Sequence, residues 1–370
     1  MKNNFTMFAL VILLVAYSSV VAEVAIDGRK IQKIDGLYYE ISSKTPITGK
    51  TVLLYPNGQK AAEGNFKNGK ENGLRTEWYE TGQKAAESNI KDGKNDGLTV
   101  LYFQNGKKKD EINFKSGKRD GLHTMWSDDG ELFKEINFKD GKEESLTTQY
   151  KEEGKEEINY KNGKKDGLTT LHYRNGKQEI NYKQGKKDGL LIQWYKNGQK
   201  HVESNYKNGK RNGLMTTWTQ DGQKTFVGNF KNGRQDGLHL RWHENGQKEE
   251  VSDYRDGIHI GQKTGWYMNG QKAQESYYKD GLLVGKKIKW YGNGQKWQES
   301  NYKEGKLDGL KTKWFDNGQK FSESNYMDGK LNGPETKWNE NGQRVLESLY
   351  KHGKLVDPDT KWYEKKEITK

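Results

Sequence analysis

Short runs of alternating apolar and polar residues cover most of this chain, and each run ends at an Asn-Gly or Asp-Gly pair or a close relative of one. The clearest example, from Gly189 to Asn212, holds the runs Leu-Leu-Ile-Gln-Trp-Tyr and His-Val-Glu-Ser-Asn-Tyr. Alternation with a period of two is typical of a β-strand, and Asn-Gly is typical of a hairpin turn. The pattern therefore predicts a β-hairpin.

This hairpin pattern recurs every 24 residues with few exceptions. A glycine opens most repeats, an aromatic residue follows five positions later, and a second aromatic follows at seventeen. Ten of the 11 tryptophans share the first aromatic phase. Such phase locking predicts stacked, equivalent repeats. The positions expected to fix the hairpins are Gly73, Gly97, Gly121, Gly189, Gly213, Gly237 and Gly309, together with Trp78, Trp194, Trp218 and Trp242.

Two repeats are shorter than the others. The intervals from Ser145 to Gly167 and from Gly167 to Gly189 are 22 residues, and the loss falls between the first turn and the second aromatic. Removing two residues keeps every strand side chain on its own face, whereas it would rotate a helix by about 200°. The short repeats therefore favour strands.

A two-residue type I′ turn at Asn197-Gly198 would set the pairing of its hairpin. Counting outward places Trp194 opposite His201 and Tyr206 opposite Gly189. An aromatic ring over a glycine covers exposed backbone, which would explain the glycine. The predicted fold is all-β: about 13 tandem hairpins in an elongated, twisted, single-layer sheet or solenoid.

The N-terminus has the features of an export signal. Lys2 precedes a short apolar run, and the small residues Val20 and Ala22 suit cleavage after position 22. Export to the periplasm, the cell surface or the medium is expected, without a transmembrane segment after cleavage; an uncleaved anchor is the alternative. The predicted organisation is a signal peptide (1–22), a cap or degenerate hairpin (23–48), repeats (49–363) and a charged tail (364–370).

The composition limits the possible chemistry. The chain has no cysteine, which excludes disulfides, thiolate metal sites and a cysteine nucleophile. Its glutamates recur with the repeat, and the histidines at 123 and 239 are interpreted as variable surface positions. No unique cluster suggests catalysis, so we expect no catalytic residue, no metal and no cofactor.

One departure from the repeat suggests a ligand surface near the C-terminus. Lysines share the position directly before the tryptophan in the last four repeats, and we expect a basic stripe beside the tryptophans, suited to an anionic glycan or lipid surface. A solvated face that keeps the sheet soluble is the alternative. Nucleic acid is not expected for an exported chain. The candidate residues are Lys289, Lys313, Lys337 and Lys361, with Trp290, Trp314, Trp338 and Trp362.

The run from Tyr195 to Lys200 and the run from Glu203 to Lys210 resemble the bacterial variant of the MORN repeat. The segments 37–39 and 46–50 resemble the opening of YwqK-like proteins, many of which carry an antitoxin label. The resemblance implies hairpin repeats, a non-catalytic role and a protein partner. An exported protein-binding scaffold is the first hypothesis, a module for envelope glycans or anionic lipids the second, and an enzyme the least favoured.

Overall fold

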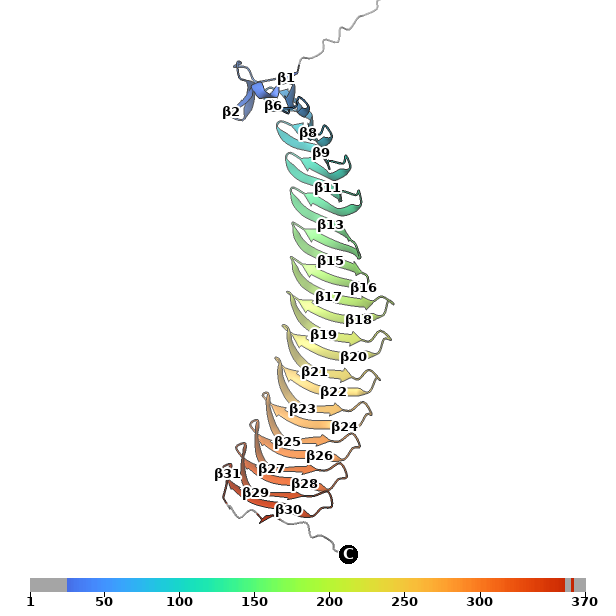
Figure 1. Ribbon diagram of the computed structural model, residues 1–370, viewed down its shortest axis with the longest axis vertical. Coiled ribbons are helices and arrows are strands. Elements are labelled where there is room, and N and C mark those ends of the chain that lie inside the picture. The colour runs from blue at the N-terminus through green and yellow to red at the C-terminus, as the bar shows by residue number, and fades with distance from the viewer. Residues whose placement is uncertain (1–24, 357–360, 363–370) are drawn as a thin grey trace, which may run out of the picture. The chain divides into compact units, whose positions relative to one another are not determined.

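The computed structural model describes residues 25–356, 361 and 362, which fall into two compact units. The N-terminal unit holds the described residues up to 133 and residues 138–141, and the C-terminal unit holds 134–137 and those from 142 onward. Strands dominate both units (Figure 1), and the described residues contain a single 3-10 turn, η1 (Gly28–Lys30). The all-β class and the tandem hairpins are confirmed. The expected signal peptide (1–22) and charged tail (364–370) lie outside the described residues.

The N-terminal unit is built from short antiparallel pairs, apart from its first strand, which runs parallel to β4. Its strands are β1 (Ile26–Asp27), β2 (Ile31–Ile34), β3 (Leu37–Glu40), β4 (Gly49–Leu54), β5 (Lys60–Lys67), β6 (Lys70–Glu71), β7 (Gly73–Trp78), β8 (Lys84–Lys91), β9 (Lys94–Tyr102), β10 (Lys108–Lys115) and β11 (Lys118–Trp126). The strand β12 (Leu132–Lys139) is divided between the two units.

Residues 26–47 pack onto the first hairpins of the N-terminal unit. The ring of Tyr38 meets that of Phe66 edge-on, with centroids 5.2 Å apart. The backbone amide of Tyr38 donates to the carbonyl of Gly69 at 2.8 Å, and the amide of Gly69 donates to the carbonyl of Ile47 at 2.8 Å. Ile47 is buried as a result. This segment therefore supplies apolar contacts that the terminal hairpin would otherwise lack.

The C-terminal unit is a single layer in which each strand from β13 to β30 packs mainly against the strands before and after it. Its strands are β13 (Lys142–Lys151), β14 (Gly154–Lys161), β15 (Lys164–Tyr173), β16 (Gly176–Lys183), β17 (Lys186–Tyr195), β18 (Lys200–Lys207), β19 (Lys210–Trp218), β20 (Lys224–Lys231), β21 (Arg234–Trp242), β22 (Lys248–Arg255), β23 (Ile258–Trp266), β24 (Lys272–Lys279), β25 (Leu282–Trp290), β26 (Lys296–Lys303), β27 (Lys306–Trp314), β28 (Lys320–Met327), β29 (Lys330–Trp338), β30 (Arg344–Lys351), β31 (Lys354–Leu355) and β32 (Lys361–Trp362).

The two turns of a full-length repeat differ in geometry. At Asn208-Gly209 both residues have positive φ, +50° and +84°, as a type I′ turn requires. At the other turn only Gly198 does, and the amide of Tyr195 donates to the carbonyl of Gln199 at 2.9 Å. The type I′ prediction is therefore wrong for Asn197-Gly198.

The turn at Asn197-Gly198 also shifts the pairing of the two strands that it joins. Trp194 lies opposite Lys200 rather than His201, because His201 is the extra residue of a β-bulge. The ring of His201 packs on that of Tyr195 with centroids 4.4 Å apart. Beyond the bulge, the predicted pairing of Gly189 with Tyr206 is confirmed.

The two short repeats lack this bulge. Their hairpins close by direct pairing of Lys151 with Gly154 and of Tyr173 with Gly176. Further along the strands Gly167 still faces Tyr182, as Gly189 faces Tyr206 in the full-length repeat. The prediction that losing two residues preserves every face is confirmed.

The glycine that opens most repeats is favoured by its backbone conformation, since even Ser145, which replaces it in one repeat, has a φ of +61°. Gly213 has a φ of +107°, and a Cβ there would lie 3.4 Å from the Cβ of Asn205. The side-chain amide of Asn205 donates to the carbonyl of Leu214 at 3.5 Å. Phe230 does lie opposite Gly213, but left-handed φ, rather than cover by the aromatic ring, accounts for the glycine.

We expect Gly213→Ala to destabilise the chain by about 1–3 kcal/mol, because a side chain there is held in a sparsely populated region of φ and ψ. The measurement is the urea concentration at the midpoint of unfolding. Gly292→Ala is the matched control, since Gly292 lacks a positive φ and a Cβ there meets no atom within 4 Å. Equal midpoints for the two variants would contradict this account.

Candidate ligand-binding faces

The sheet of the C-terminal unit has two chemically distinct faces, because alternate residues of a strand point to opposite sides. We name them the tryptophan face and the tyrosine face, after Trp194 and Tyr206. In the hairpin β17–β18 the tryptophan face carries Leu190, Ile192, Trp194, Lys200, Glu203 and Asn205, and the tyrosine face carries Gly189, Leu191, Gln193, Val202, Ser204 and Tyr206.

The hairpin turns line the two long edges of the sheet, which we call its rims. Side chains at both rims bond each hairpin to the next. At one rim the hydroxyl of Tyr195 donates to the carbonyl of Trp218 at 2.9 Å, and the amide of Asn197 donates to the carbonyl of Gln220 at 2.9 Å. At the other rim a carboxylate oxygen of Asp188 accepts the backbone amide of Asn208 at 3.0 Å. The equivalent bonds recur 23 and 20 residues apart in other repeats. They hold equivalent side chains in regular rows.

The tryptophans are engaged within the sheet. The ammonium group of Lys272 lies 5.8 Å from the ring centroid of Trp290 in the following repeat and 3.2 Å from a carboxylate oxygen of Glu275. Lys296 and Lys320 lie 5.7 and 5.6 Å from Trp314 and Trp338 in the same way. Among the structural tryptophans, Trp78 and Trp218 have Lys60 and Lys200, and Trp194 has Lys177 at 4.6 Å. These cation–π contacts join consecutive repeats.

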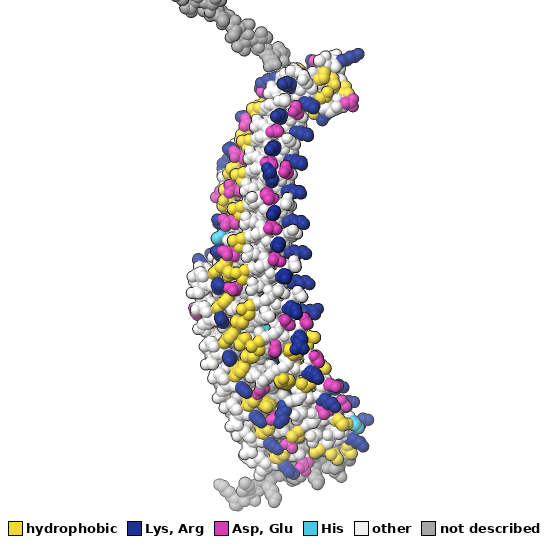
Figure 2. Space-filling model, turned by 180° about the vertical axis from the view of Figure 1, so that it is seen from behind, with side chains coloured by type: hydrophobic (Ala, Val, Ile, Leu, Met, Phe, Trp, Pro, Cys, Tyr) yellow, Lys and Arg dark blue, Asp and Glu magenta, His cyan; other side chains and the backbone are white. Residues whose placement is uncertain are grey.

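Rows of charge accompany these contacts. Figure 2 shows positive and negative side chains alternating along rows that follow the stacked strands. Hydrogen bonds from Lys286 and Lys296 hold the pKa of Glu299 below its usual range. The carboxylates of this row therefore stay ionised and paired with lysines.

The predicted lysines and tryptophans are placed on different faces. Lys289 and Lys313 lie directly before Trp290 and Trp314 in their strands, so they project from the tyrosine face. Lys337 stands in the same position before Trp338. The expected stripe of lysines beside these tryptophans is not formed, because neighbours in a strand point apart. The backbones of Lys361 and Trp362 pair with Glu347 and Leu346; their side chains lie outside the description.

Four lysines form a cluster on the tyrosine face across three strands. Lys287 and Lys289 come from β25, and Lys311 and Lys313 come from β27. The strand β26 between them places Ser300 between Lys287 and Lys311, and Gln298 between Lys289 and Lys313. Ser300 is fully buried, and its hydroxyl accepts a hydrogen bond from the Gln298 amide at 2.8 Å. We call these four residues the central lysine cluster.

The central lysine cluster has an unbalanced positive charge. None of its four lysines makes an ion pair within the part of the chain that the structure describes. Burial, and then the charges of Lys289 and Lys263, lower the pKa of Lys287. Burial, followed by the charges of Lys313 and Lys289, lowers the pKa of Lys311. The cluster is therefore a place where an added negative charge would be stabilised.

Sequence reasoning missed the histidines of the same face. His239 and His259 belong to a stack with Tyr254 and Tyr278, in which successive ring centroids are 4.8, 4.1 and 5.0 Å apart. Burial lowers the pKa of both histidines. His239 is only 3% exposed, so its interpretation as a surface position is wrong.

His123 is also buried, in the N-terminal unit, where its Nε2 lies 2.8 Å from a carboxylate oxygen of Asp110. Its interpretation as a surface position is wrong for the same reason. The period-two alternation places the residue two positions after the repeat glycine on the buried face, and this signal could have identified both histidines.

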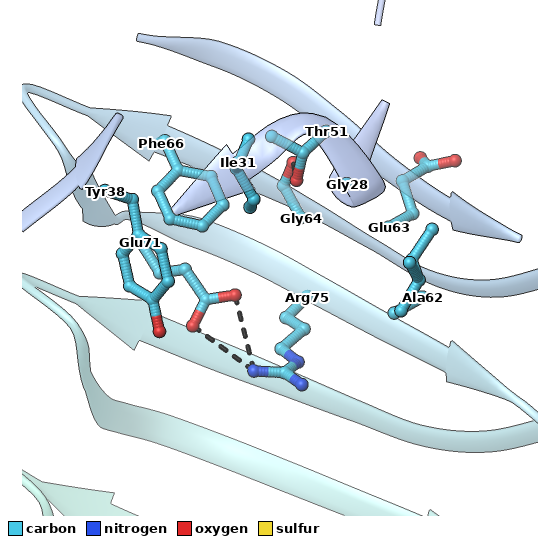
Figure 3. A pocket seen from close by; sticks show the side chains of 11 residues that line it. Gly28, Ile31, Tyr38, Thr51, Ala62, Glu63, Gly64, Phe66, Glu71 and Arg75 are labelled. Carbon is cyan, nitrogen blue, oxygen red and sulfur yellow. Dashed lines mark hydrogen bonds and ion pairs between the residues drawn. The ribbon is translucent and has the colours of Figure 1, made fainter. Parts of the chain in front are cut away.

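A small cavity lies among the first hairpins of the N-terminal unit, where Tyr38, Phe66, Glu71 and Arg75 surround it (Figure 3). The guanidinium of Arg75 donates to both carboxylate oxygens of Glu71 at 3.3 Å, and it also pairs with Glu77 at 2.5 Å. Its charge is therefore balanced, unlike that of the central lysine cluster.

The described residues lack two features that other sites have. Among residues 25–356 and 361–362, no group of three or more His, Asp or Glu side chains is arranged to hold a metal ion. The same described residues include no helix of the length and apolarity that crossing a bilayer requires.

Comparison with known families agrees with the repeat geometry. A family model described as "MORN repeat variant" matches residues 47–68, 71–92, 95–116, 119–140 and 187–208. The chain carries MORN-variant repeats. The first four matches follow one another through the N-terminal hairpins, and the fifth covers β17–β18. Repeats of this kind are generally surfaces for binding proteins or membranes.

No curated protein matches the chain. Among solved structures, the chain of a crystal structure of TcdB2-TccC3-Cdc42 is 12% identical with a TM-score of 0.17, covering 86% of this chain and 20% of that one. A mutant Tc holotoxin pore of Photorhabdus luminescens is 11% identical with a TM-score of 0.16, covering 84% and 21%. This chain thus spans about a fifth of the length of those it matches, and likenesses of this size carry no argument.

The central lysine cluster predicts a pH dependence of stability. A lysine with a lowered pKa loses its proton earlier in the folded chain than in the unfolded one, so the unfolded chain binds more protons between the two pKa values. The free energy of unfolding should therefore rise with pH in the window below 10.5, the ordinary lysine value. Lys289→Gln removes a charge that lowers the pKa of both Lys287 and Lys311, so this rise should become smaller.

The measurement is the urea midpoint at a series of pH values up to 10.5. Lys303→Gln serves as the control, because Lys303 is exposed at the end of β26 and its substitution removes the same charge. An identical slope with pH in the two variants would argue against coupling within the cluster.

Proposed function

We propose that the chain is an exported, non-catalytic scaffold whose MORN-variant repeats bind a partner protein. The observation that carries this proposal is a row of exposed leucines on the tryptophan face of the C-terminal unit. Leu146, Leu168, Leu214, Leu238 and Leu310 are 41, 39, 50, 52 and 39% exposed. They share one repeat position. Leu146 and Leu168, and likewise Leu214 and Leu238, lie two strands apart, or about 10 Å. Half-buried Leu190 holds the position between these two pairs, and Gln262 and Lys286 hold it between Leu238 and Leu310.

The row suits protein binding for two reasons. Exposed apolar side chains that recur on one surface are typical of interaction sites. The rim bonds fix their spacing, so a partner meets a surface that needs little ordering on binding. The partner implied is a protein with apolar groups at a matching spacing. An antitoxin-like role, which YwqK-like relatives suggest, is one form that such binding takes.

The double variant Leu214→Glu and Leu238→Glu tests this surface. We expect it to lose the partner captured by the unmodified chain from envelope fractions of its own cells, because two buried charges at the contact oppose association. The measurement is the amount of that partner retained, by quantitative mass spectrometry. The control Lys210→Gln with Arg234→Gln changes the net charge equally on the same two strands, β19 and β21. Equal retention by both variants would contradict a role for the leucines.

The export proposal has its own test. When the chain is made with its natural N-terminus, we expect the exported form to begin at Glu23, because the small residues Val20 and Ala22 precede that position. N-terminal sequencing of the protein from the envelope or the medium measures this. A membrane-bound form that retains the first residues would instead indicate an uncleaved anchor.

A second candidate function is a module for an envelope glycan or an anionic lipid surface. The central lysine cluster favours it, because four lysines without ion pairs on one face favour a negatively charged ligand. This ligand would bind to the tyrosine face, opposite the leucine row.

A further inference from the structure

The strongest unexplained feature of the molecule is the unpaired charge of the central lysine cluster. Lys287 and Lys311 are half-buried, and their side chains flank the fully buried Ser300. Partial burial and mutual repulsion both disfavour charged lysines. Acidic neighbours occur only at the margins: Lys263 pairs with Glu250 at 2.8 Å, and Lys337 lies 3.9 Å from Glu335, among the described residues. The cluster between these margins is arranged to receive an anion.

The spacing of the lysines restricts the kind of anion. Lys289 and Lys313 occupy equivalent positions two strands apart, so their anchor points are separated by about 10 Å. Double-stranded DNA carries a charge about every 1.7 Å along its axis, which is far denser. In an extended peptide, acidic residues on one side recur about every 6.6–6.8 Å, which equals the spacing of Lys287 and Lys289 along β25 but is shorter than the step across the strands from Lys289 to Lys313. A ligand that runs across the strands therefore places its acidic groups farther apart, with neutral groups between them.

Neutral hydrogen-bonding groups lie between the lysines. Gln298 separates Lys289 from Lys313, and Ser322 separates Lys313 from Lys337. The row thus alternates between positive and neutral polar side chains. Two linked sugar rings span a distance similar to this repeat, so a polysaccharide with an acid group on every second ring has the complementary alternation.

Exposed aromatic rings lie next to this row. Trp297 is the one tryptophan outside the main tryptophan phase; it is 38% exposed, with the ammonium group of Lys289 4.8 Å from its ring centroid. Phe321 occupies the same position one repeat later and is 39% exposed. Flat apolar rings beside charged and amide groups fit the faces of sugar rings better than they fit a bare phosphate.

We infer that the central lysine cluster, with Trp297 and Phe321, binds an acidic polysaccharide in which charged and neutral sugars alternate. The inference rests on the second candidate function and specifies its ligand. Lysines contact the acid groups, Gln298 and Ser322 bond to the neutral sugars, and the aromatic rings pack against sugar faces. Binding neutralises the cluster and relieves the repulsion between its lysines.

The test uses the mature full-length chain, from residue 23 onward, with hyaluronan oligosaccharides as the probe, because hyaluronan alternates an acidic and a neutral sugar. Binding is measured by calorimetry at low and at raised salt. We expect binding that weakens with salt and that falls by about tenfold or more for each lysine removed in Lys289→Gln with Lys313→Gln, since each removes a hydrogen bond to a charged group. We expect Trp297→Ala to weaken binding as well.

The matched control is Lys303→Gln with Lys306→Gln, which removes two charges from β26 and β27 at an exposed turn. Because exposed charges contribute little, its affinity should change by less than about twofold. Circular dichroism and urea midpoints show whether each variant is folded. Failure of the unmodified chain to bind hyaluronan at low salt, or equal losses in the two double variants, would overturn the inference.

Two further probes separate this inference from the functions on which it depends. If phosphatidylglycerol vesicles, but not hyaluronan, bind through Lys289 and Lys313, the polysaccharide inference fails while the second candidate function stands. If poly-glutamate binds more tightly than hyaluronan through the same lysines, the inference also fails, and the cluster is a protein-binding site. If none of the three probes binds, both the inference and the second candidate function fail, whereas the leucine row remains testable by capture of its partner.

Discussion

Hydrogen bonding between successive hairpins takes the place that a hydrophobic core has in a globular domain. In the C-terminal unit each strand packs mainly against its two neighbours, so no second layer supplies apolar burial there. Its most buried side chains include small hydroxyl residues such as Ser300 and Thr169. Stability must therefore be a sum of nearest-neighbour terms: the backbone ladder, the rim bonds and the cation–π contacts of the tryptophans.

Because stability depends on contacts between neighbouring repeats, the two faces of the sheet differ in how much their residues vary. On the tryptophan face the same residue types recur because each contacts the next repeat, as Lys272 contacts Trp290. The tyrosine face varies more: the position two residues after the repeat glycine holds Thr169, Leu191, His239 or Lys287. Stacking thus depends on the constant positions, and the variable positions are left to determine what the surface binds.

The sequence was sufficient to predict what depends on period and phase, namely the strands, the faces and the preserved register of the short repeats. It failed where geometry depends on hydrogen bonds within a turn. Asn-Gly occurs at both turns, yet Asn208 is left-handed and Asn197 is not, because the turn at Asn197 carries a bulge. Only part of the candidate site is predictable. The repeat phase reveals the row of lysines, but neighbours in a strand point to opposite faces, so Lys289 contacts Trp297 and not the adjacent Trp290.

The two short repeats have a mechanical consequence. Among the described residues, their turns lack the side-chain bonds that Tyr195 and Asn197 make to the next hairpin, although Tyr173 and Asn175 occupy the equivalent positions in the second short repeat. Within the described residues the side-chain link between those turns is an exposed ion pair of Arg174 with Glu153 at 3.5 Å. Because an exposed ion pair contributes little, resistance to bending at that rim comes mainly from the backbone ladder. We therefore expect the stretch from β13 to β17 to bend more easily than the rest of the C-terminal unit. Bending there would let the curvature of the sheet adjust to the shape of a bound partner.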